Sequence, residues 1–254
     1  MCALRQLKGL MRFNKFEFLF LPCPEPSEPC HESTTPRPRP SHPKVPHPYL
    51  GRLYQVEYAM EAISHAGTCL GIVCTDGVLL AAERRIASPL LDQSKSSEKI
   101  FPISDDIWCA VAGVTSDANL LIDWARTHAA KWRISHGHEI RVEQLAEALA
   151  NLKQSYTQHG GMRPFGASFL LAGWDKHFGF QLYQTDPSGN YSGWLATCIG
   201  ANQSTAHGIL KTELTEPSSN TTESALKLLF RVLAKTIEGT AQLSAEKRSK
   251  LLFS

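Results

Sequence analysis

The chain has 254 residues, of which 43% are hydrophobic, and its formal net charge is +2. This length and apolar content suffice for one substantial core, so we expect one main folded domain. Lys and Arg are scattered among Asp and Glu, which leaves no basic stripe for a nucleic-acid backbone, and no apolar run is long enough to span a bilayer. The composition therefore argues against nucleic-acid-binding and membrane-spanning classes.

The seven cysteines include no Cys-x-x-Cys pair. An odd number with this spacing favours free thiols in a reducing compartment over a disulfide framework or a zinc site. His136 and His138 flank a glycine typical of a turn, and a solvated loop explains them better than a metal site does. We therefore expect neither a metal nor a cofactor.

Residues 1–48 are rich in proline, with ten of the fifteen prolines between Pro22 and Pro48. Proline removes backbone donors and disfavours helix, so we expect a disordered segment, with peptide recognition by Pro36–Pro40 as an alternative. Basic and apolar residues near the start weakly resemble a targeting segment, but Glu17 interrupts the apolar run. Removal of residues 1–47 is therefore expected to leave the thermal transition nearly unchanged.

A helix is expected to follow, because Leu53, Val56, Met60 and Ile63 recur at helical spacing. These four positions should face the core, and Tyr54 and Tyr58 should share a second face. Near-continuous apolar runs then predict strands buried on both faces. These runs are 68–74, 78–82, 100–103 and 107–112, and the Asp76-Gly77 step between the first two is typical of a tight hairpin.

Two helices are expected next, with apolar faces along 121–132 and 142–156 and with Gly137 ending the first. His128 on the first apolar face should be a packed histidine. Further strands are predicted at 165–174, 178–183 and 191–199, followed by a helix whose start Asn220 and Glu223 would cap. The order of helix, strands, helix pair, strands and helix pair favours an α+β layered fold over an alternating parallel sheet.

Several blocks carry a specific family resemblance, beginning with Gly51-Arg52-Leu53-Tyr54-Gln55-Val56-Glu57-Tyr58-Ala59. Asp76-Gly77-Val78-Leu79-Leu80, Ser97-Glu98-Lys99-Ile100 and Arg163-Pro164-Phe165-Gly166 follow in the family's order. The chain resembles the α-type subunits of the eukaryotic proteasome core particle, in a domain expected at 49–247. The resemblance implies the four-layer αββα sandwich of the N-terminal-nucleophile hydrolases. The divergent C-terminus, 248–254, replaces the family's final strands, so we expect those strands to be missing and a sheet edge to be exposed.

Catalytic relatives in this family use an N-terminal threonine whose own amine serves as the base. The family spacing places an acid sixteen residues and a lysine thirty-two residues after that threonine, and counting back from Glu83 and Lys99 gives Gly67. Gly67 has no hydroxyl. Thr68 lies one residue late, which on a strand turns its side chain to the opposite face. We therefore predict no catalytic residue and a structural role for Glu83; an active threonine hydrolase maturing between Gly67 and Thr68 is the alternative.

The resemblance implies that Lys99 binds the C-terminal carboxylate of a docking activator, although a solvated lysine at the start of a strand is the alternative. It also implies that Gly51, Arg52, Tyr54 and Tyr58 form the helix on the ring surface and the base of the gate. The family's Tyr-Asp pair ahead of this helix is missing, so normal gating by this subunit is in question.

The function that the resemblance implies is that of a non-catalytic α-ring subunit in ubiquitin-dependent protein degradation. Such a subunit scaffolds the β rings and forms part of the gated entrance and the activator-docking surface. Its partners would be neighbouring α subunits, β-ring subunits and the regulatory particle or other activators through their C-terminal tails, in the cytoplasm and the nucleus. A truncated isoform that does not assemble is the alternative, because both ends depart from the family pattern.

Overall fold

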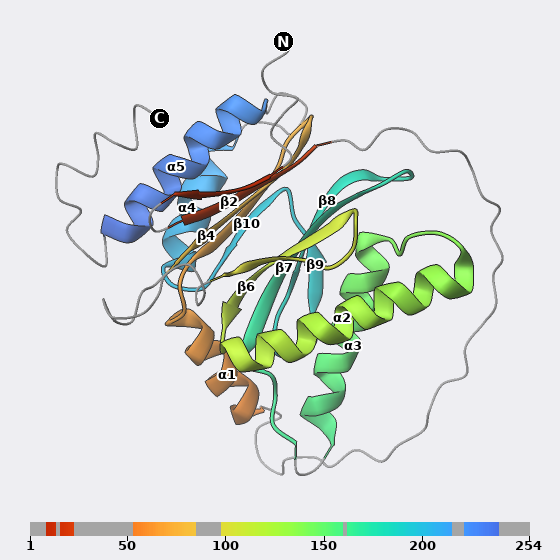
Figure 1. The fold of residues 1–254 in the computed structure, drawn as a ribbon. Coiled ribbons are helices and arrows are strands. Elements are labelled where there is room, and N and C mark those ends of the chain that lie inside the picture. The colour runs from red at the N-terminus through yellow and green to blue at the C-terminus, as the bar shows by residue number, and fades with distance from the viewer. Residues whose placement is uncertain are drawn as a thin grey trace.

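The computed structural model describes residues 9–13, 16–22, 53–84, 98–159, 162–214 and 221–238. Within these ranges the chain forms five helices and two five-stranded sheets, in which every pair of neighbouring strands is antiparallel (Figure 1). This arrangement confirms the α+β class.

The first sheet has the strand order β1-β2-β4-β3-β10. Its strands are β1 (Gly9–Phe13), β2 (Phe16–Pro22), β3 (Cys69–Val73), β4 (Gly77–Glu83) and β10 (Ala196–Ile199). The predicted hairpin joins β3 to β4, and the Cys74 amide donates to the Gly77 carbonyl at 2.8 Å. Gly77 is needed for close approach, because a Cβ there would lie 2.3 Å from the Leu21 carbonyl oxygen in β2.

The second sheet has the strand order β5-β6-β7-β8-β9. Its strands are β5 (Ile100–Pro102), β6 (Ile107–Gly113), β7 (Ala167–Asp175), β8 (Gly179–Thr185) and β9 (Tyr191–Gly193). The predicted strand over 191–199 is wrong as a single element, because the chain turns after β9 and its second half becomes β10 of the first sheet. An apolar run alone does not indicate that its two halves pair with different partners.

The helices are α1 (Tyr54–Ser64), α2 (Thr115–His136), α3 (Val142–Gln158), α4 (Gln203–Glu213) and α5 (Thr222–Glu238). As predicted, α2 ends at Gly137, which has a left-handed φ of 74° and donates its amide to the Arg133 carbonyl. His128 stacks on Trp124 with ring centroids 4.9 Å apart, which confirms its packed role.

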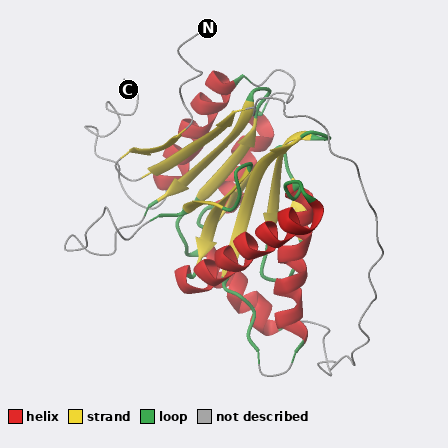
Figure 2. Ribbon diagram, turned by 45° about the vertical axis from the view of Figure 1, so that its right-hand side comes forward, coloured by secondary structure: helices red, strands yellow, loops and turns green. Residues whose placement is uncertain are grey.

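Three clusters of buried side chains alternate with the sheets and helices. One cluster joins α2 and α3 to the second sheet, another fills the space between the two sheets, and a third joins the first sheet to α4 and α5. The layers therefore follow the order helix pair, sheet, sheet, helix pair, and α1 lies at one end of the sheets (Figures 1 and 2).

The N-terminal segment differs from the sequence-based expectation. Residues 9–22 were expected to be disordered, but β1 and β2 form a hairpin, and β2 pairs with β4 over its full length, from Phe16↔Glu83 to Pro22↔Gly77. As a result β4 is paired on both sides, by β3 and by β2. Phe18 and Leu19 are 8% and 2% exposed, so burial of these side chains stabilises the hairpin on the sheet.

Helix α1 buries a narrower stripe than its periodicity predicts. Val56 and Ile63 are buried, whereas Leu53 and Met60 are 50% and 48% exposed. The prediction was wrong for these two positions because α1 lies at the end of the sheets, where the core covers one narrow face (Figure 1).

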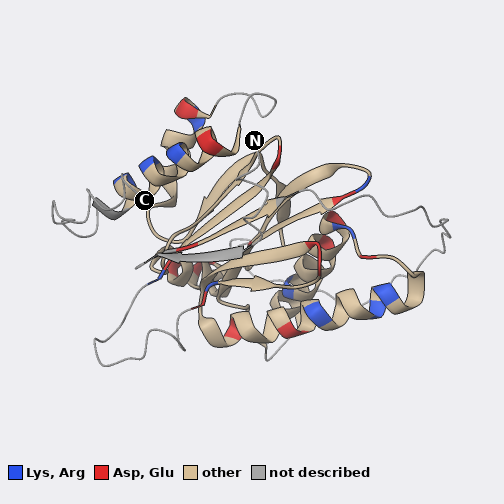
Figure 3. Cartoon of the chain, turned by 45° about the horizontal axis from the view of Figure 1, so that its top comes forward, with Lys and Arg blue, Asp and Glu red and all other residues tan. Residues whose placement is uncertain are grey.

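Charged residues lie mainly on the helices and at the ends of strands, and both signs are mixed along α2 (Figure 3). Across the described ranges, none of the helices combines the length and the apolar character that crossing a membrane requires. The four cysteines that the structure describes, Cys69, Cys74, Cys109 and Cys198, are free and buried.

Candidate functional site

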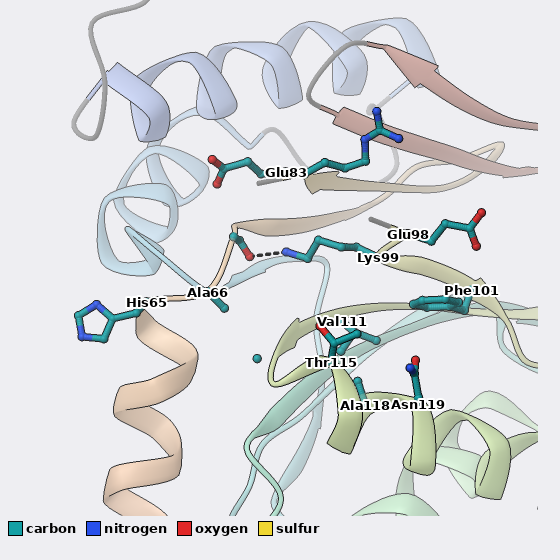
Figure 4. A pocket seen from close by; sticks show the side chains of 13 residues that line it. His65, Ala66, Glu83, Glu98, Lys99, Phe101, Val111, Thr115, Ala118 and Asn119 are labelled. Carbon is teal, nitrogen blue, oxygen red and sulfur yellow. Dashed lines mark hydrogen bonds between the residues drawn. The ribbon is translucent and has the colours of Figure 1, made fainter. Parts of the chain in front are cut away.

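A cavity of about 230 Å³ lies where the end of α1, the starts of β3 and β5, the end of β4 and the first turn of α2 meet (Figure 4). Its lining is mixed in charge and includes two carboxylates, a lysine and an arginine. The residues that line it are His65, Ala66, Gly67, Glu83, Arg84, Glu98, Lys99, Phe101, Val111, Gly113, Thr115, Ala118 and Asn119.

Lys99 and Gly67, which the spacing argument linked, meet in this cavity. The Lys99 Nζ atom donates a hydrogen bond of 2.6 Å to the Gly67 carbonyl oxygen (Figure 4). The lysine lies just ahead of β5, and its side chain is partly buried. The amine therefore points at the backbone position where a catalytic relative would carry its nucleophile, and this position offers a carbonyl oxygen and no hydroxyl.

Glu83 reaches the same place from the end of β4. Its Oε2 atom accepts a hydrogen bond of 3.1 Å from the Thr68 amide. This contact agrees with the structural role expected for Glu83. Arg84, the next residue, has its Nη1 atom 3.9 Å from the Glu17 carboxylate.

Thr68 does not serve as a replacement nucleophile. Its side chain is 2% exposed, and its hydroxyl donates to the Ala201 carbonyl at 3.0 Å, away from Lys99. The loop before α4 approaches closely here, because a Cβ on Gly200 would lie 2.6 Å from the Gly67 carbonyl oxygen, and Gly200 has a φ of 93°. The contacts of Gly200 and Ala201 could not be predicted from the sequence, since no local pattern links them to Thr68.

Cys69 follows Thr68 in the chain, and it is fully buried. Burial raises the pKa of the Cys69 thiol, while the nearby Lys99 amine acts in the opposite direction. The thiol donates to the Val111 carbonyl at 3.2 Å. A protonated and inaccessible thiol is a poor nucleophile, so the site is better suited to binding than to covalent chemistry.

The first turn of α2 forms one wall of the cavity and is held by a charged pair. Arg163 donates two hydrogen bonds to the Asp117 carboxylate, at 2.6 and 2.8 Å, and Asp117 also accepts the Gly166 amide at 2.9 Å. The Arg163 hydrogen bond holds the pKa of Asp117 below its usual value. This pair explains physically why the Arg163-Pro164-Phe165-Gly166 block packs against the start of α2.

The two described residues expected at the gate, Tyr54 and Tyr58, are not among those that line this cavity. Tyr54 and Tyr58 are 44% and 63% exposed on α1, as their shared face predicted, and Gly51 and Arg52 fall outside the described residues. His136 and His138 lie beside Trp132 with their ring centroids 6.0 Å apart. In the part of the chain that the structure describes, no group of three or more His, Cys, Asp or Glu could hold a metal ion.

Comparisons with known proteins agree with this geometry. The family model described as "Proteasome subunit" matches residues 63–246. Proteasome subunit alpha type-4-1 of Oryza sativa subsp. indica is 53% identical over 197 residues, which cover 78% of each chain. Proteasome subunit alpha type-4 of Spinacia oleracea is 53% identical and type-4-A of Arabidopsis thaliana 52% identical, with the same coverage. With a glycine at the nucleophile position, this chain belongs to the proteasome subunit family as a non-catalytic α-type member.

Proposed function

We propose that this chain is an α-ring subunit that scaffolds the β rings and forms part of the gated substrate entrance of the core particle. The observation that carries the proposal is the geometry at Gly67. Lys99 and Glu83 contact the carbonyl and the amide of the Gly67–Thr68 peptide bond, and Gly67 has no hydroxyl, so the arrangement is kept while the nucleophile is absent. A subunit of this kind contributes interfaces rather than chemistry.

The layer order supports the finer assignment of fold. Helix pair, sheet, sheet and helix pair is the order expected for the αββα sandwich of the N-terminal-nucleophile hydrolases. The partners we infer are neighbouring α subunits, β-ring subunits and activators, in the cytoplasm and the nucleus. The exposed tyrosines of α1, Tyr54 and Tyr58, are the described residues we assign to the ring surface, next to Gly51 and Arg52 in the sequence.

Lys99 is, in this proposal, the receptor for the C-terminal carboxylate of an activator. Its amine lines an open cavity and is held by a neutral carbonyl oxygen rather than by an acid. A charge-assisted contact with a carboxylate would be stronger than this neutral contact. The cavity is large enough to admit a terminal carboxylate, so an incoming chain end could replace the Gly67 carbonyl as the partner of the amine.

Assembly is tested by sedimentation. The tagged full chain, expressed with the other core-particle subunits, should co-sediment with the assembled particle. Recovery in the monomer fraction alone would instead support the truncated isoform that does not assemble. A tagged α subunit already known to assemble in the same cells is the positive control.

The carboxylate site is tested by crosslinking in reconstituted particles. A peptide that ends in a free carboxylate should crosslink beside Lys99, and the same peptide with a C-terminal amide should not. Lys99→Ala should lower the apparent affinity at this site about tenfold or more, because a hydrogen bond to a charged group is lost. Lys227→Ala, which changes an exposed lysine on α5, is the matched control. Unchanged crosslinking after Lys99→Ala would show that Lys99 does not bind the carboxylate, and would favour the alternative of a solvated lysine at the start of a strand.

A further inference from the structure

Glu17 on β2 is a buried acid in a segment that lies outside the family match. The matched residues are 63–246, and Glu17 is 0% exposed. Placing an ionised carboxylate in an apolar interior costs several kcal/mol unless it is paired and hydrogen-bonded. A strand of Phe and Leu would pack well without this acid, so its contacts need a physical explanation.

The Glu17 carboxylate contacts the backbone on either side of the pocket lysine. Its Oε2 atom accepts the Lys99 amide at 2.9 Å and the Ile100 amide at 3.2 Å. Its Oε1 atom lies 3.9 Å from the Arg84 Nη1 atom, and the Arg84 side chain is 9% exposed. One side chain of the hairpin thus joins the end of β4 to the start of β5.

The alternation of β2 explains how Glu17 reaches this position. Phe18 and Phe20 point towards α4 and α5, whereas Leu19 and Leu21 point into the space between the two sheets. Glu17 shares the parity of the leucines, so its side chain also points between the sheets. Its cross-strand partner is Ala82, which brings the carboxylate to the end of β4 that lines the cavity.

Among the described residues, the start of β5 has few other backbone restraints. The strand has three residues and lies at the edge of its sheet, where β6 is its one partner within the described ranges. The Val111 amide donates to the Lys99 carbonyl at 3.0 Å, so β6 holds one side of the residue and Glu17 holds the other. Short edge strands with few hydrogen bonds open readily.

We propose that Glu17 is a positioning residue for Lys99, so that the N-terminal hairpin contributes to the carboxylate-binding pocket. Glu17 fixes the backbone of Lys99, and this restraint aims the amine at Gly67 and at the open cavity. The proposal rests on the assignment of Lys99 as the carboxylate receptor. It assigns to residues 9–22 a functional role that a disordered extension could not perform.

The first test measures amide hydrogen exchange in the full chain. Glu17→Ala should speed exchange of the Lys99 and Ile100 amides about tenfold or more relative to the amides of β4, because those two amides lose their acceptor. Glu17→Gln keeps an acceptor oxygen without the charge and should give a smaller increase at the same two amides. If Glu17→Ala does not fold, Glu17→Gln decides the question by the same comparison.

The matched control is Leu19→Ala, which weakens the same strand without touching Lys99. This variant should not speed amide exchange at Lys99 and Ile100 more than it speeds amide exchange in β4. Equal acceleration across β4 in the Glu17 variants, or no acceleration at residues 99 and 100, would overturn the proposal. Equal acceleration across β4 would mean that Glu17 stabilises the hairpin on the sheet and does not specifically restrain the backbone of Lys99.

The second test uses crosslinking of the carboxylate-ending peptide in reconstituted particles. Glu17→Gln should reduce crosslinking beside Lys99 by about threefold or more, while Leu19→Ala should not. Crosslinking that is unchanged in Glu17→Gln but lost in Lys99→Ala would sink the positioning role and leave the receptor role intact. Crosslinking unchanged in Lys99→Ala would remove the receptor role, and the exchange data would then report on backbone restraint alone.

Discussion

The arrangement of an acid and a lysine around a nucleophile position can persist when the nucleophile itself is absent. Glu83 and Lys99, next to Gly67, are an example. The amine of Lys99 and the carboxylate of Glu83 reach residues 67 and 68, although they come from separate strands. A glycine at this position replaces the reactive hydroxyl with a carbonyl acceptor. The same geometry that would activate a nucleophile in a catalytic relative therefore supports an amine facing an open cavity.

Lys153 is a second residue with a specific physical role. It is fully buried on α3, and its Nζ atom donates to the Ala167 carbonyl at 3.0 Å and to the Thr185 hydroxyl at 2.8 Å. Burial lowers the pKa of Lys153 to about 7, and the nearby Asp186 acts in the opposite direction. The amine therefore tethers α3 to β7 and β8 at the cost of desolvating a basic group.

The stability of the wild type should consequently depend on pH through Lys153. The unfolded chain keeps its proton up to a pKa of 10.5, while the folded chain releases it at about 7, so the free energy of unfolding should rise as the pH increases between these values. From about pH 7 to about pH 9 the gain should be about 2 kcal/mol relative to Lys153→Met. Urea unfolding of both proteins at the two pH values measures this difference. Parallel pH curves for the two proteins would contradict the assignment.

At the scale of elements, the N-terminal hairpin is part of the fold rather than an appendage. It completes the first sheet beside β4, and Phe18 packs against Phe230 of α5 with ring centroids 5.2 Å apart. An unpaired strand edge would invite association with other chains, and β2 covers the edge that β4 would otherwise present.

Deletion of residues 1–22 should therefore destabilise the domain strongly. The loss of buried Phe18 and Leu19 alone should lower the free energy of unfolding by about 5 kcal/mol or more. Thermal melting of the deletion variant should show this loss, and deletion of residues 1–8, which stops before β1, is the control. If the variant that lacks residues 1–22 melts at the same temperature as the wild type, this segment makes no stabilising contacts, as the sequence-based expectation had it.

At the scale of the whole molecule, the described residues around Gly67 include no accessible nucleophile. The hydroxyl of Thr68 is committed to the Ala201 carbonyl, and the Cys69 thiol is buried. Both sheets are covered by helices on their outer faces, and the cavity at Gly67 lies at the ends of the strands beside α1 (Figure 2).

The full chain should not hydrolyse fluorogenic peptides, because the position that faces Lys99 has no side chain. Its intact mass should still include the residues before Thr68, and a covalent inhibitor directed at N-terminal threonine should not label it. Purified core particle, which contains active subunits, is the positive control for both assays. Labelling of Thr68 as an N-terminal residue would establish the alternative of an active hydrolase.

The sequence by itself determined the α+β class and the order of the central elements, and the family resemblance linked Glu83 and Lys99 to Gly67. The class and the order depend on local periodicity, which can be read from neighbouring residues. The turn at Gly137 and the packing of His128 were predictable for the same reason.

Only the tertiary structure decided that residues 9–22 join the first sheet, that 191–199 divides between two sheets, and that Leu53 and Met60 stay exposed. Each of these outcomes depends on a partner far away in the sequence. Strand pairing follows from which edge is vacant and which face is already covered, and no local pattern records either condition. Glu17 interrupts the apolar run of residues 16–21, and this break made β2 difficult to recognise from the sequence. The partners that compensate the buried acid, Lys99, Ile100 and Arg84, come together only in the folded chain.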